Sequence, residues 1–267
     1  RRVSSPDERS AHIVEIVRNA GYASNDDLAR ILGVTVQTVR RDVNRLAEQG
    51  RLARHHGGAG LPSSIENIAY SERQVLNRSE KQAIARLAAA RIPHHSSLFI
   101  NLGTTTEAFA QALHGHDGLQ VITNNLQVAA GLWSRPGFKG VVAGGMVRAQ
   151  DGGVIGQSAC EQIAQYRADF GVIGISGIDE DGALLDFDVE EIRVARAIMR
   201  NARQVLLLAD HTKFGRRPMM RMGALDEVDA LFTDRPPPGP ISSLLAERGI
   251  ACHVAEWDGD DFRKGTS

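Results

Sequence analysis

The sequence has few of the features that mark membrane, secreted or nucleotide-binding proteins. Its two cysteines, Cys160 and Cys252, lie far apart and form no Cys-x-x-Cys pattern, which fits a reducing compartment. No stretch approaches the roughly 18 consecutive apolar residues that span a bilayer, and Arg1-Arg2 is not followed by the apolar core of a secretory signal. These absences predict a cytoplasmic protein with no membrane partner.

Nucleotide-binding motifs are also missing. The chain contains neither G-x-G-x-x-G nor G-x-x-x-x-G-K-[ST], so neither a dinucleotide nor a P-loop nucleotide is indicated and no cofactor is expected. Hydrophobic residues make up 42% and charged residues 24% of the chain, which are the proportions of an ordinary globular protein. A length of 267 residues predicts a small domain and a larger one.

The charges are unevenly distributed along the chain. Residues 1–60 hold ten arginines, no lysine and seven acidic residues, a net charge of +3, whereas the remainder carries −4. A basic head on an acidic body predicts that only the head binds a polyanion. A chance fluctuation is the alternative explanation for a difference of this size.

Residues 1–60 predict a winged helix-turn-helix. Apolar residues at helical spacing predict helices over residues 8–20 and 36–48. Between them, a short helix is expected to begin after Ser24, whose hydroxyl caps it, and to end at Gly33. Two short helices joined by a glycine turn form the helix-turn-helix unit.

The outward side of the third helix carries hydrogen-bond donors suited to DNA. Gln can pair with adenine and Arg with guanine through two hydrogen bonds, and the N-terminal residues of a recognition helix normally enter the major groove. We therefore expect Gln37, Thr38 and Arg41 to read bases. The alternative is an ordinary solvated face of a packing helix. The candidate DNA contacts on this helix are Thr35, Gln37, Thr38, Arg40, Arg41, Asn44 and Arg45.

Residues 51–59 predict the wing, a short hairpin with a glycine turn. Its Arg54, His55 and His56 are expected to contact the DNA backbone or minor groove. The two histidines could instead bind a metal ion, but adjacent side chains point apart and no Cys or carboxylate partner is nearby. No metal site is therefore expected.

Residues 61–78 predict a linker, and residues 79–256 predict an α/β domain that begins with a helix over 79–91. Beyond this helix, short apolar runs alternate with amphipathic segments, which predicts a largely parallel sheet covered by helices. The predicted strands span residues 97–101, 119–123, 139–143, 169–175, 204–209, 229–233 and 250–254.

Polar or glycine residues follow five of these strands, where ligands of parallel sheets bind. After the first strand, Gly103, Thr104, Thr105 and Thr106 form a turn that opens a helix, and its amides, dipole and hydroxyls would favour a phosphate. The alternative is that Thr104 only caps the helix. Lys213 could add a positive charge or be a solvated surface residue. The other strand ends are Thr123-Asn124-Asn125, Gly144-Gly145, Ser176-Gly177 and Asp210-His211-Thr212-Lys213.

Several motifs together resemble the DeoR family of bacterial regulators, and the likeness extends from about residue 8 to residue 254. The motifs are Thr38-Val39-Arg40-Arg41-Asp42, Arg54-His55-His56-Gly57-Gly58-Ala59, Asp151-Gly152-Gly153, Ile175-Ser176-Gly177-Ile178-Asp179 and Leu184-Leu185-Asp186-Phe187-Asp188.

This resemblance implies a sensor domain with a fold like that of ribose-5-phosphate isomerase. It also implies a repressor of carbon-metabolism genes that binds double-stranded operator DNA as a homodimer or homotetramer. Glycerol 3-phosphate or a sugar phosphate would release it. The implied effector contacts are Gly103, Thr104, Thr105, Asn124, Gly177 and Lys213, and Glu191 matches an acid common in the family.

Two positions depart from the family pattern. Asn101 stands where many members have Asp, and Ala195 stands where they have Lys. The loss of a carboxylate weakens any catalytic role for the domain. The alternative function is a sugar-phosphate isomerase fused to a DNA-binding head, with a base among Asp179, Asp181, Asp186, Asp188 and Glu190. Runs of acids are more often solvated loops, so we expect a regulator and not an enzyme.

Overall fold

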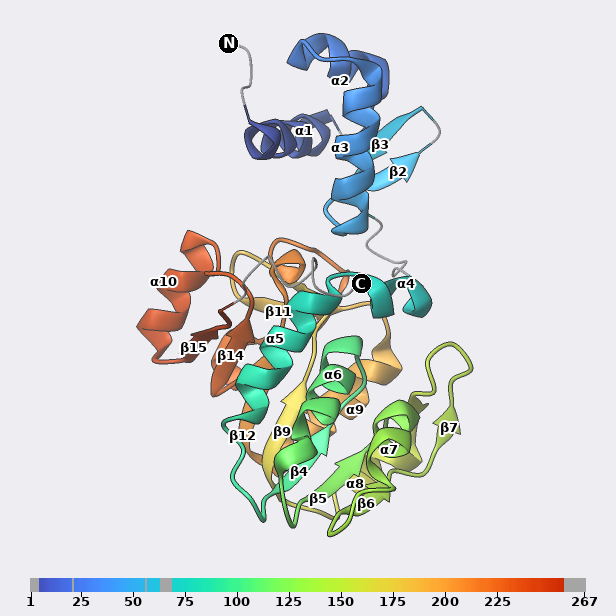
Figure 1. Ribbon diagram of the computed structural model, residues 1–267, viewed down its shortest axis with the longest axis vertical. Coiled ribbons are helices and arrows are strands. Elements are labelled where there is room, and N and C mark those ends of the chain that lie inside the picture. Colours follow the sequence, from blue (N-terminus) through green and yellow to red (C-terminus); the bar gives the residue numbers. More distant parts are fainter. Residues whose placement is uncertain (1–4, 21, 56, 63–68, 257–267) are drawn as a thin grey trace, which may run out of the picture. The chain divides into compact units, whose positions relative to one another are not determined.

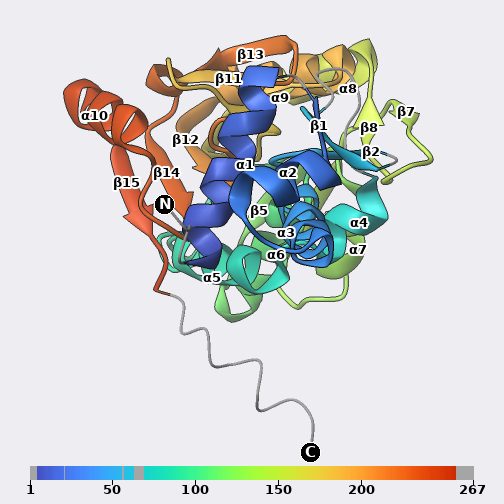
Figure 2. The ribbon, with the colours of Figure 1, turned by 90° about the horizontal axis from the view of Figure 1, so that it is seen from above.

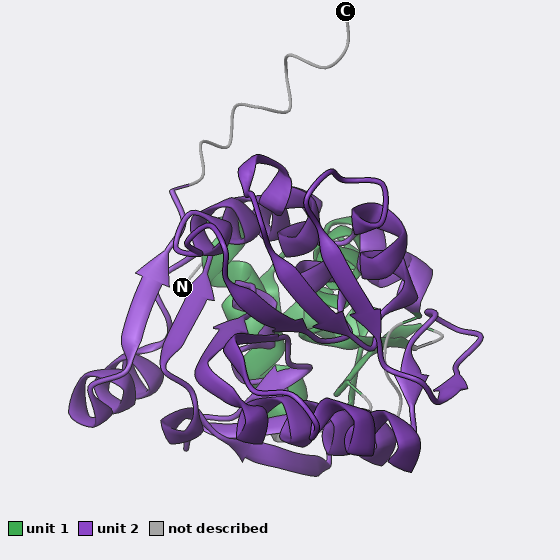
Figure 3. Cartoon of the chain, turned by 90° about the horizontal axis from the view of Figure 1, so that it is seen from below, with its two compact units in different colours: residues 1–69 green, residues 70–267 purple. Residues whose placement is uncertain are grey.

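The computed structural model describes residues 5–20, 22–55, 57–62 and 69–256. The chain divides into two compact units, residues 1–69 and 70–267 (Figure 3). None of the helices in the part of the chain that the structure describes has the length and apolar character needed to cross a bilayer.

The first unit has the predicted winged helix-turn-helix architecture (Figure 1). Its helices are α1 (Pro6–Ala20), α2 (Asn25–Leu32) and α3 (Val36–Glu48), and its strands are β1 (Tyr22–Ser24), β2 (Ala53–His55) and β3 (Gly58–Gly60). The strands form an antiparallel sheet in the order β1-β3-β2. We did not expect β1, because three residues are too few to show the alternating pattern of a strand.

Local hydrogen bonds explain where the helices of this unit begin and end. The Ser24 hydroxyl accepts from the Asp27 amide at 3.1 Å, and the Thr35 hydroxyl accepts from the Thr38 amide at 3.2 Å. Gly33 ends α2 at φ +65°, a left-handed conformation that glycine adopts without strain. The sequence therefore fixes the turn between α2 and α3.

Asp42 is a buried carboxylate that joins α3 to α1. It is 3% exposed and accepts from Arg9 Nε at 2.5 Å and from Arg45 Nη2 at 3.3 Å. Arg45 Nη2 also donates to Ser10 Oγ at 2.6 Å. Arg45, which we expected to contact DNA, is thus engaged within its own unit. The helical spacing could not reveal the contact with α1, because Ser10 lies 35 residues from Arg45 in the sequence.

The second unit is built on a seven-stranded parallel sheet in the order β15-β14-β12-β9-β4-β5-β6. Its strands are β4 (Ser97–Ile100), β5 (Gln120–Thr123), β6 (Lys139–Val142), β9 (Ala168–Ile173), β12 (Ala202–Leu208), β14 (Ala230–Thr233) and β15 (Ala251–Val254). All seven coincide with predicted strands to within two residues at either end.

Helices cover both faces of this sheet, because alternate residues of each strand point to opposite sides. Leu98 and Ile100 of β4 pack with α5 (Arg78–Ala89), α6 (Thr104–Ala112) and α7 (Leu126–Leu132). Phe99, between them, packs with α8 (Gln157–Ile163) and α9 (Val189–Asn201) on the other face. Figure 2 shows the two helical layers with the sheet between them. The last helix, α10 (Gly239–Arg248), also packs on the face of α9.

Some elements of the second unit were not expected from the sequence. An antiparallel sheet joins β10 (Gly177–Ile178), β11 (Ala183–Asp186) and β13 (Met220–Ala224), and a hairpin joins β7 (Met146–Val147) and β8 (Val154–Ile155). Most of these strands are too short to show periodicity. The residues proposed as a linker, 61–78, also include α4 (Tyr70–Val75), which belongs to the second unit.

Replacing Asp42 with alanine should weaken the packing of α1 on α3. The change would leave the half-buried guanidinium of Arg9 without its counter-ion, which costs about 3 kcal/mol for a buried pair. Amide exchange in α1 and α3 of the full chain should then accelerate on the order of a hundredfold. Glu48→Ala, an exposed change in the same helix, is the control. Equal exchange in both variants would show that the ion pair does not hold these helices together.

Candidate functional site

One face of α3 is buried, and the opposite face carries exposed side chains with free hydrogen-bond donors. Val39, Val43 and Leu46 are buried in the core of the first unit. Gln37, Arg40, Arg41 and Asn44 are exposed. In the described residues, the side chains of Arg40 and Arg41 have no hydrogen-bond or ion-pair partner within the protein. Such a face can donate to base edges and phosphates.

The wing and α3 enclose a groove of about 530 Å³. Arg54 Nη1 of the wing donates to Asn44 Oδ1 of α3 at 3.3 Å, so these candidate contacts lie side by side. Thr35 and Thr38 share a hydrogen bond of 2.9 Å between their hydroxyls and serve the helix cap. His55 lies in β2 by its backbone, whereas its side chain and the whole of His56 fall outside the described residues. The groove is lined by Asn25, Arg40, Val43, Asn44, Arg54, Gly57 and Gly58.

The second unit has a cavity at the point where its strand order reverses. The chain proceeds from β4 to β5 and β6 on one side, and later places β9 on the other side of β4. Loops that leave β4 and β9 therefore diverge, which is where open α/β sheets bind ligands. A cavity of about 40 Å³ lies there, between Asn101 and Gly103 after β4 and Gly174 and Ser176 after β9.

Helix α6 begins at this cavity with an uncapped N-terminus. Gly103 takes φ +138°, and no side chain caps the helix. Thr106 Oγ1 instead donates to the carbonyl oxygens of Asn101 and Gly103, both at 2.8 Å, which fixes the turn. The first amides of α6, at Thr104 and Thr105, are therefore available to an anion, and the helix dipole favours one.

A second, outer cavity of about 310 Å³ lies between α4, α5 and α6 and includes Thr104. Arg78 and Lys81 supply its positive charge. Lys81 is 4% exposed, and its Nζ donates to the carbonyl oxygen of Arg73 at 2.5 Å. Burial lowers the pKa of Lys81 to about 8. This outer cavity has the size and charge for a phosphate group.

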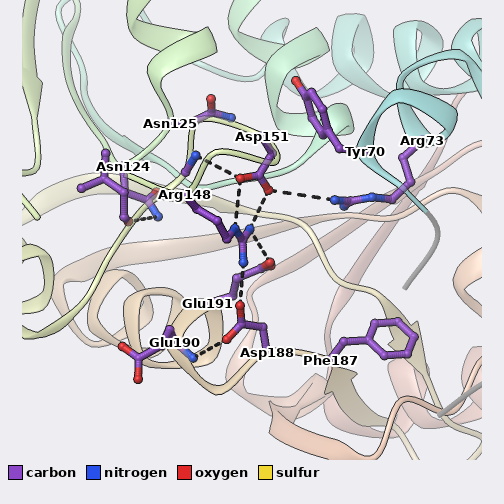
Figure 4. Close-up of polar contacts among 12 residues, drawn as sticks. Tyr70, Arg73, Asn124, Asn125, Arg148, Asp151, Phe187, Asp188, Glu190 and Glu191 are labelled. Carbon is purple, nitrogen blue, oxygen red and sulfur yellow. Dashed lines mark hydrogen bonds and ion pairs between the residues drawn. The ribbon is translucent and has the colours of Figure 1, made fainter. Parts of the chain in front are cut away.

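Arg148 organises the acids around the inner cavity (Figure 4). Its Nη2 lies 2.5 Å from both Asp151 Oδ2 and Glu191 Oε1, and its Nη1 lies 2.6 Å from Asp188 Oδ2. Burial opposes ionisation of Asp151, but Arg148 outweighs it and holds the pKa of Asp151 below its ordinary value. Burial and the neighbouring Asp186 raise the pKa of Glu191 to about 7, which Arg148 offsets only in part.

Some of the effector residues predicted from the sequence lie at the cavities, and others serve the fold. Gly103 and Glu191 line the inner cavity, Thr104 lines the outer one, and Thr105 lies buried in the first turn of α6. Lys213 follows β12 in the short helix η2 (His211–Lys213). Burial lowers its pKa, and Asp210 partly offsets this effect.

The remaining predicted residues serve the fold. Asn125 Oδ1 accepts from the first amides of α7, and its Nδ2 donates to Glu107 Oε1 at 3.0 Å. Asn124 Nδ2 donates to the Val154 carbonyl oxygen at 3.3 Å, while its buried Oδ1 has no partner among the described residues. A Cβ at Gly177 would come within 2.3 Å of the Arg216 carbonyl oxygen, so this glycine allows two backbones to approach closely.

Sequence reasoning missed several residues that line or surround the cavities. They are Tyr70, Arg73, Lys81, Glu107 and Arg148. The first two fell in the proposed linker. One signal in the sequence could have indicated that Lys81 is buried. It lies on the same helix face as Ile84, Ala85 and Ala88, which are core residues. The described residues contain no group of three or more His, Cys, Asp or Glu side chains placed to hold a metal ion.

Comparison with known proteins assigns both units. Residues 9–65 match the model of the DeoR-like helix-turn-helix domain, and residues 76–235 match that of the DeoR C terminal sensor domain. The chain belongs to the DeoR family. This assignment agrees with the motifs that suggested the family from sequence.

Relatives in this family are transcriptional repressors. The chain is 48% identical over 243 residues to the glycerol-3-phosphate regulon repressor of Escherichia coli (strain K12), covering 91% of this chain and 96% of the relative. It is 44% identical over 250 residues to the HTH-type transcriptional repressor CsqR of the same organism, covering 94% and 96%. This DeoR-family chain is accordingly a DNA-binding transcriptional repressor, and the relatives point to a regulator and not an enzyme.

A solved structure with a similar arrangement is ribose 5-phosphate isomerase A from Methanocaldococcus jannaschii. The TM-score is 0.39 at 13% identity, covering 52% of this chain and 56% of the isomerase. At this level the likeness concerns the course of the chain alone, and no statement about a ligand follows from it.

Replacing Glu191 with glutamine should change how stability depends on pH. The folded-state pKa of Glu191 lies above its ordinary value of 4.5, so ionising it opposes folding as the pH rises from about 4.5 through about 7. Between pH 5 and pH 8, the wild type should lose about 2 kcal/mol of unfolding free energy relative to Glu191→Gln in denaturant titrations. The neighbouring change Glu190→Gln should leave the wild-type slope intact. Parallel pH profiles for the wild type and Glu191→Gln would refute the raised pKa.

Proposed function

We propose that this repressor controls genes of glycerol or sugar metabolism and leaves its operator when a phosphorylated metabolite binds the second unit. Glycerol 3-phosphate is the first candidate, because the relative that is 48% identical is named for the glycerol-3-phosphate regulon. The exposed, unpartnered donor face of α3 beside the wing is the observation that supports the DNA-binding part of this proposal.

The contacts to DNA divide by position on α3. Gln37, Thr38 and Arg41, at or near the exposed N-terminal half, would read base edges in the major groove. Arg40 and Asn44 would contact phosphates along the groove shared with Arg54. His55 and His56 of the wing stay candidate backbone contacts. Arg45 is left out, because its Nη2 already donates to Ser10 of α1 and to Asp42.

The effector would span the two cavities of the second unit. Its phosphate would lie at the amides of Thr104 and Thr105, with Lys81 as the counter-ion. Its hydroxyl groups would donate to acceptors of the inner cavity, among them Asn101 Oδ1, which is buried without a partner in the described residues. A carboxylate at that end would meet Glu107, Asp186 and Glu191, so a neutral polyol or sugar end is favoured.

A repressor that an effector releases needs two conformational states with different operator affinity, and two recognition helices that bind two half-sites. The effector must bind the two states with different affinities, and a coupling of about 1–3 kcal/mol corresponds to a 5- to 150-fold change in operator affinity. One recognition helix reads few base pairs, and half-sites lie about 34 Å apart per helical turn. We therefore propose a homodimer or homotetramer that acts in the cytoplasm, where the DNA is.

The acids of the site support binding more than catalysis. Asp151 and Asp188 are already held by Arg148 in ion pairs, which suits a charged frame and not a proton-transferring base. Turnover of ribose 5-phosphate by the purified protein would overturn this part of the proposal.

Arg41→Ala should remove the preference for operator over random DNA. Losing one base contact costs about 1–3 kcal/mol, or roughly tenfold to hundredfold in specific affinity. Footprinting and gel shifts on a genomic duplex selected by the wild type measure this ratio. Arg30→Ala, an exposed change in α2, should bind like the wild type. A normal footprint by Arg41→Ala would refute the assignment of Arg41.

Lys81→Met should keep operator binding and lose release by effector. Methionine retains most of the buried stem and removes the charge that we assign to the phosphate. In gel shifts with the wild type, glycerol 3-phosphate should lower operator affinity, whereas unphosphorylated glycerol should not. The titration includes ribose 5-phosphate to compare sugar phosphates. Release of Lys81→Met at wild-type concentrations of glycerol 3-phosphate would place the phosphate elsewhere.

A further inference from the structure

Two hydrogen bonds join helix α4 to the rest of the second unit across the effector cavities, and a third lies within α4. Tyr70 OH donates to Glu107 Oε2 of α6 at 2.9 Å, and Gln74 Nε2 donates to Tyr70 OH at 2.9 Å. Lys81 Nζ of α5 donates to the Arg73 carbonyl oxygen at 2.5 Å. Burial and the adjacent Glu107 raise the pKa of Tyr70, so its hydroxyl remains a donor. We call this arrangement of α4 the closed position.

The Gln74–Tyr70–Glu107 chain of hydrogen bonds lies where the two cavities meet. Glu107 lines both the inner and the outer cavity, Tyr70 lines the inner one, and Gln74 lines the outer one. Figure 4 shows Tyr70 and Arg73 near Asp151 and Arg148. A molecule that reaches from one cavity to the other therefore has to pass these side chains.

The inner cavity is much the smaller of the two while α4 is closed. Its volume is about 40 Å³, whereas that of the outer cavity is about 310 Å³. The outer cavity has room for a phosphate group, and a polyol end that enters the inner cavity has to pass the wall between them. Tyr70 and Arg73 are the wall residues that belong to α4.

The junction after α4 has the properties of a hinge. Asn77, between α4 and α5, adopts φ 52° and ψ 39°, a left-handed conformation uncommon for a residue with a side chain. Its Nδ2 donates to Asp210 Oδ1 at 3.2 Å, which anchors the junction to the sheet edge. A short helix that precedes the anchor can move while α5 stays in place.

We propose that α4 is a lid, that the effector must displace it to occupy both cavities, and that the Tyr70–Glu107 hydrogen bond is the positioning contact that keeps it closed. This inference rests on the proposed function. Tyr70 is the first residue of the second unit, and the chain reaches the DNA-reading unit through the residues before it. Displacement of α4 would therefore move the point at which the second unit begins.

The lid makes an unusual prediction about affinity. If the effector binds only the open position, its apparent dissociation constant is higher than the intrinsic one, because part of the binding free energy is used to open the lid. Tyr70→Phe removes the hydroxyl that keeps the lid closed and preserves the ring. The variant should therefore bind glycerol 3-phosphate more tightly, by roughly two- to tenfold, which is the range for one lost hydrogen bond.

Calorimetry on the full chain tests this with two probes. Glycerol 3-phosphate should bind Tyr70→Phe more tightly than the wild type, and it should release operator DNA at lower concentration. Inorganic phosphate fits the outer cavity without passing Tyr70, so its affinity should be the same in both proteins. Tyr166→Phe, a change at an exposed tyrosine of the same unit, should match the wild type with both probes.

Hydrogen exchange gives a second readout that a purely structural role of Tyr70 would not produce. Glycerol 3-phosphate should accelerate amide exchange in residues 70–75, whereas a ligand that packs beneath a fixed helix would slow it. Unchanged or weaker binding by Tyr70→Phe, or protection of residues 70–75, would overturn the lid. If the wild type itself does not bind glycerol 3-phosphate, the proposed effector fails, and the lid inference fails with it.

Discussion

Parallel strands all end at the same edge of a sheet, and this constraint determines where the second unit can bind anything. The reversal of strand order between β4 and β9 opens that edge at one point. The loops gather charged groups around it, and each buried charge is stable only beside a partner. The cations are Arg73, Lys81, Arg148, Lys213 and Arg216, and the anions are Glu107, Asp151, Asp186, Asp188, Glu191 and Asp210. The acids outnumber the cations, so an anion placed here would need the backbone amides of α6 as well as side chains.

In the DNA-reading unit, one helix, α3, both packs in the core and presents exposed arginines. Val39, Val43 and Leu46 of α3 hold the core, and Asp42 fastens α1 through Arg9 and Arg45. Arginines on the same helix therefore have opposite roles. Arg45 bonds Ser10 and Asp42 through its Nη2, whereas Arg40 and Arg41 are exposed. The difference comes from a rotation of about 100° per residue around the helix axis, which decides which guanidinium reaches Asp42 and Ser10.

The inner cavity is partly lined by residues that are close in sequence to the DNA-reading unit. Tyr70 and Arg73 belong to the wall of the inner cavity and lie at the start of the second unit. A segment with few buried contacts and an anchor at Asn77 can change position at low cost, unlike the helices packed on the sheet. A sensor needs such an element, because a ligand that fits one rigid state cannot shift an equilibrium.

The sequence by itself determined the architecture of both units. Helix caps at Ser24 and Thr35, the glycine at Gly33 and the apolar runs of the seven parallel strands are local signals, so their elements lie where predicted. The turn at Gly103 was also predicted, because a glycine followed by hydroxyl residues at a strand end is a local signal. Only the tertiary structure decided which polar residues meet. Arg148 contacts Glu191 across 43 positions of sequence, Arg45 turns inward to Ser10, and Tyr70 reaches Glu107 from a stretch that showed no periodicity. Such pairings depend on how distant segments pack, which no local pattern records.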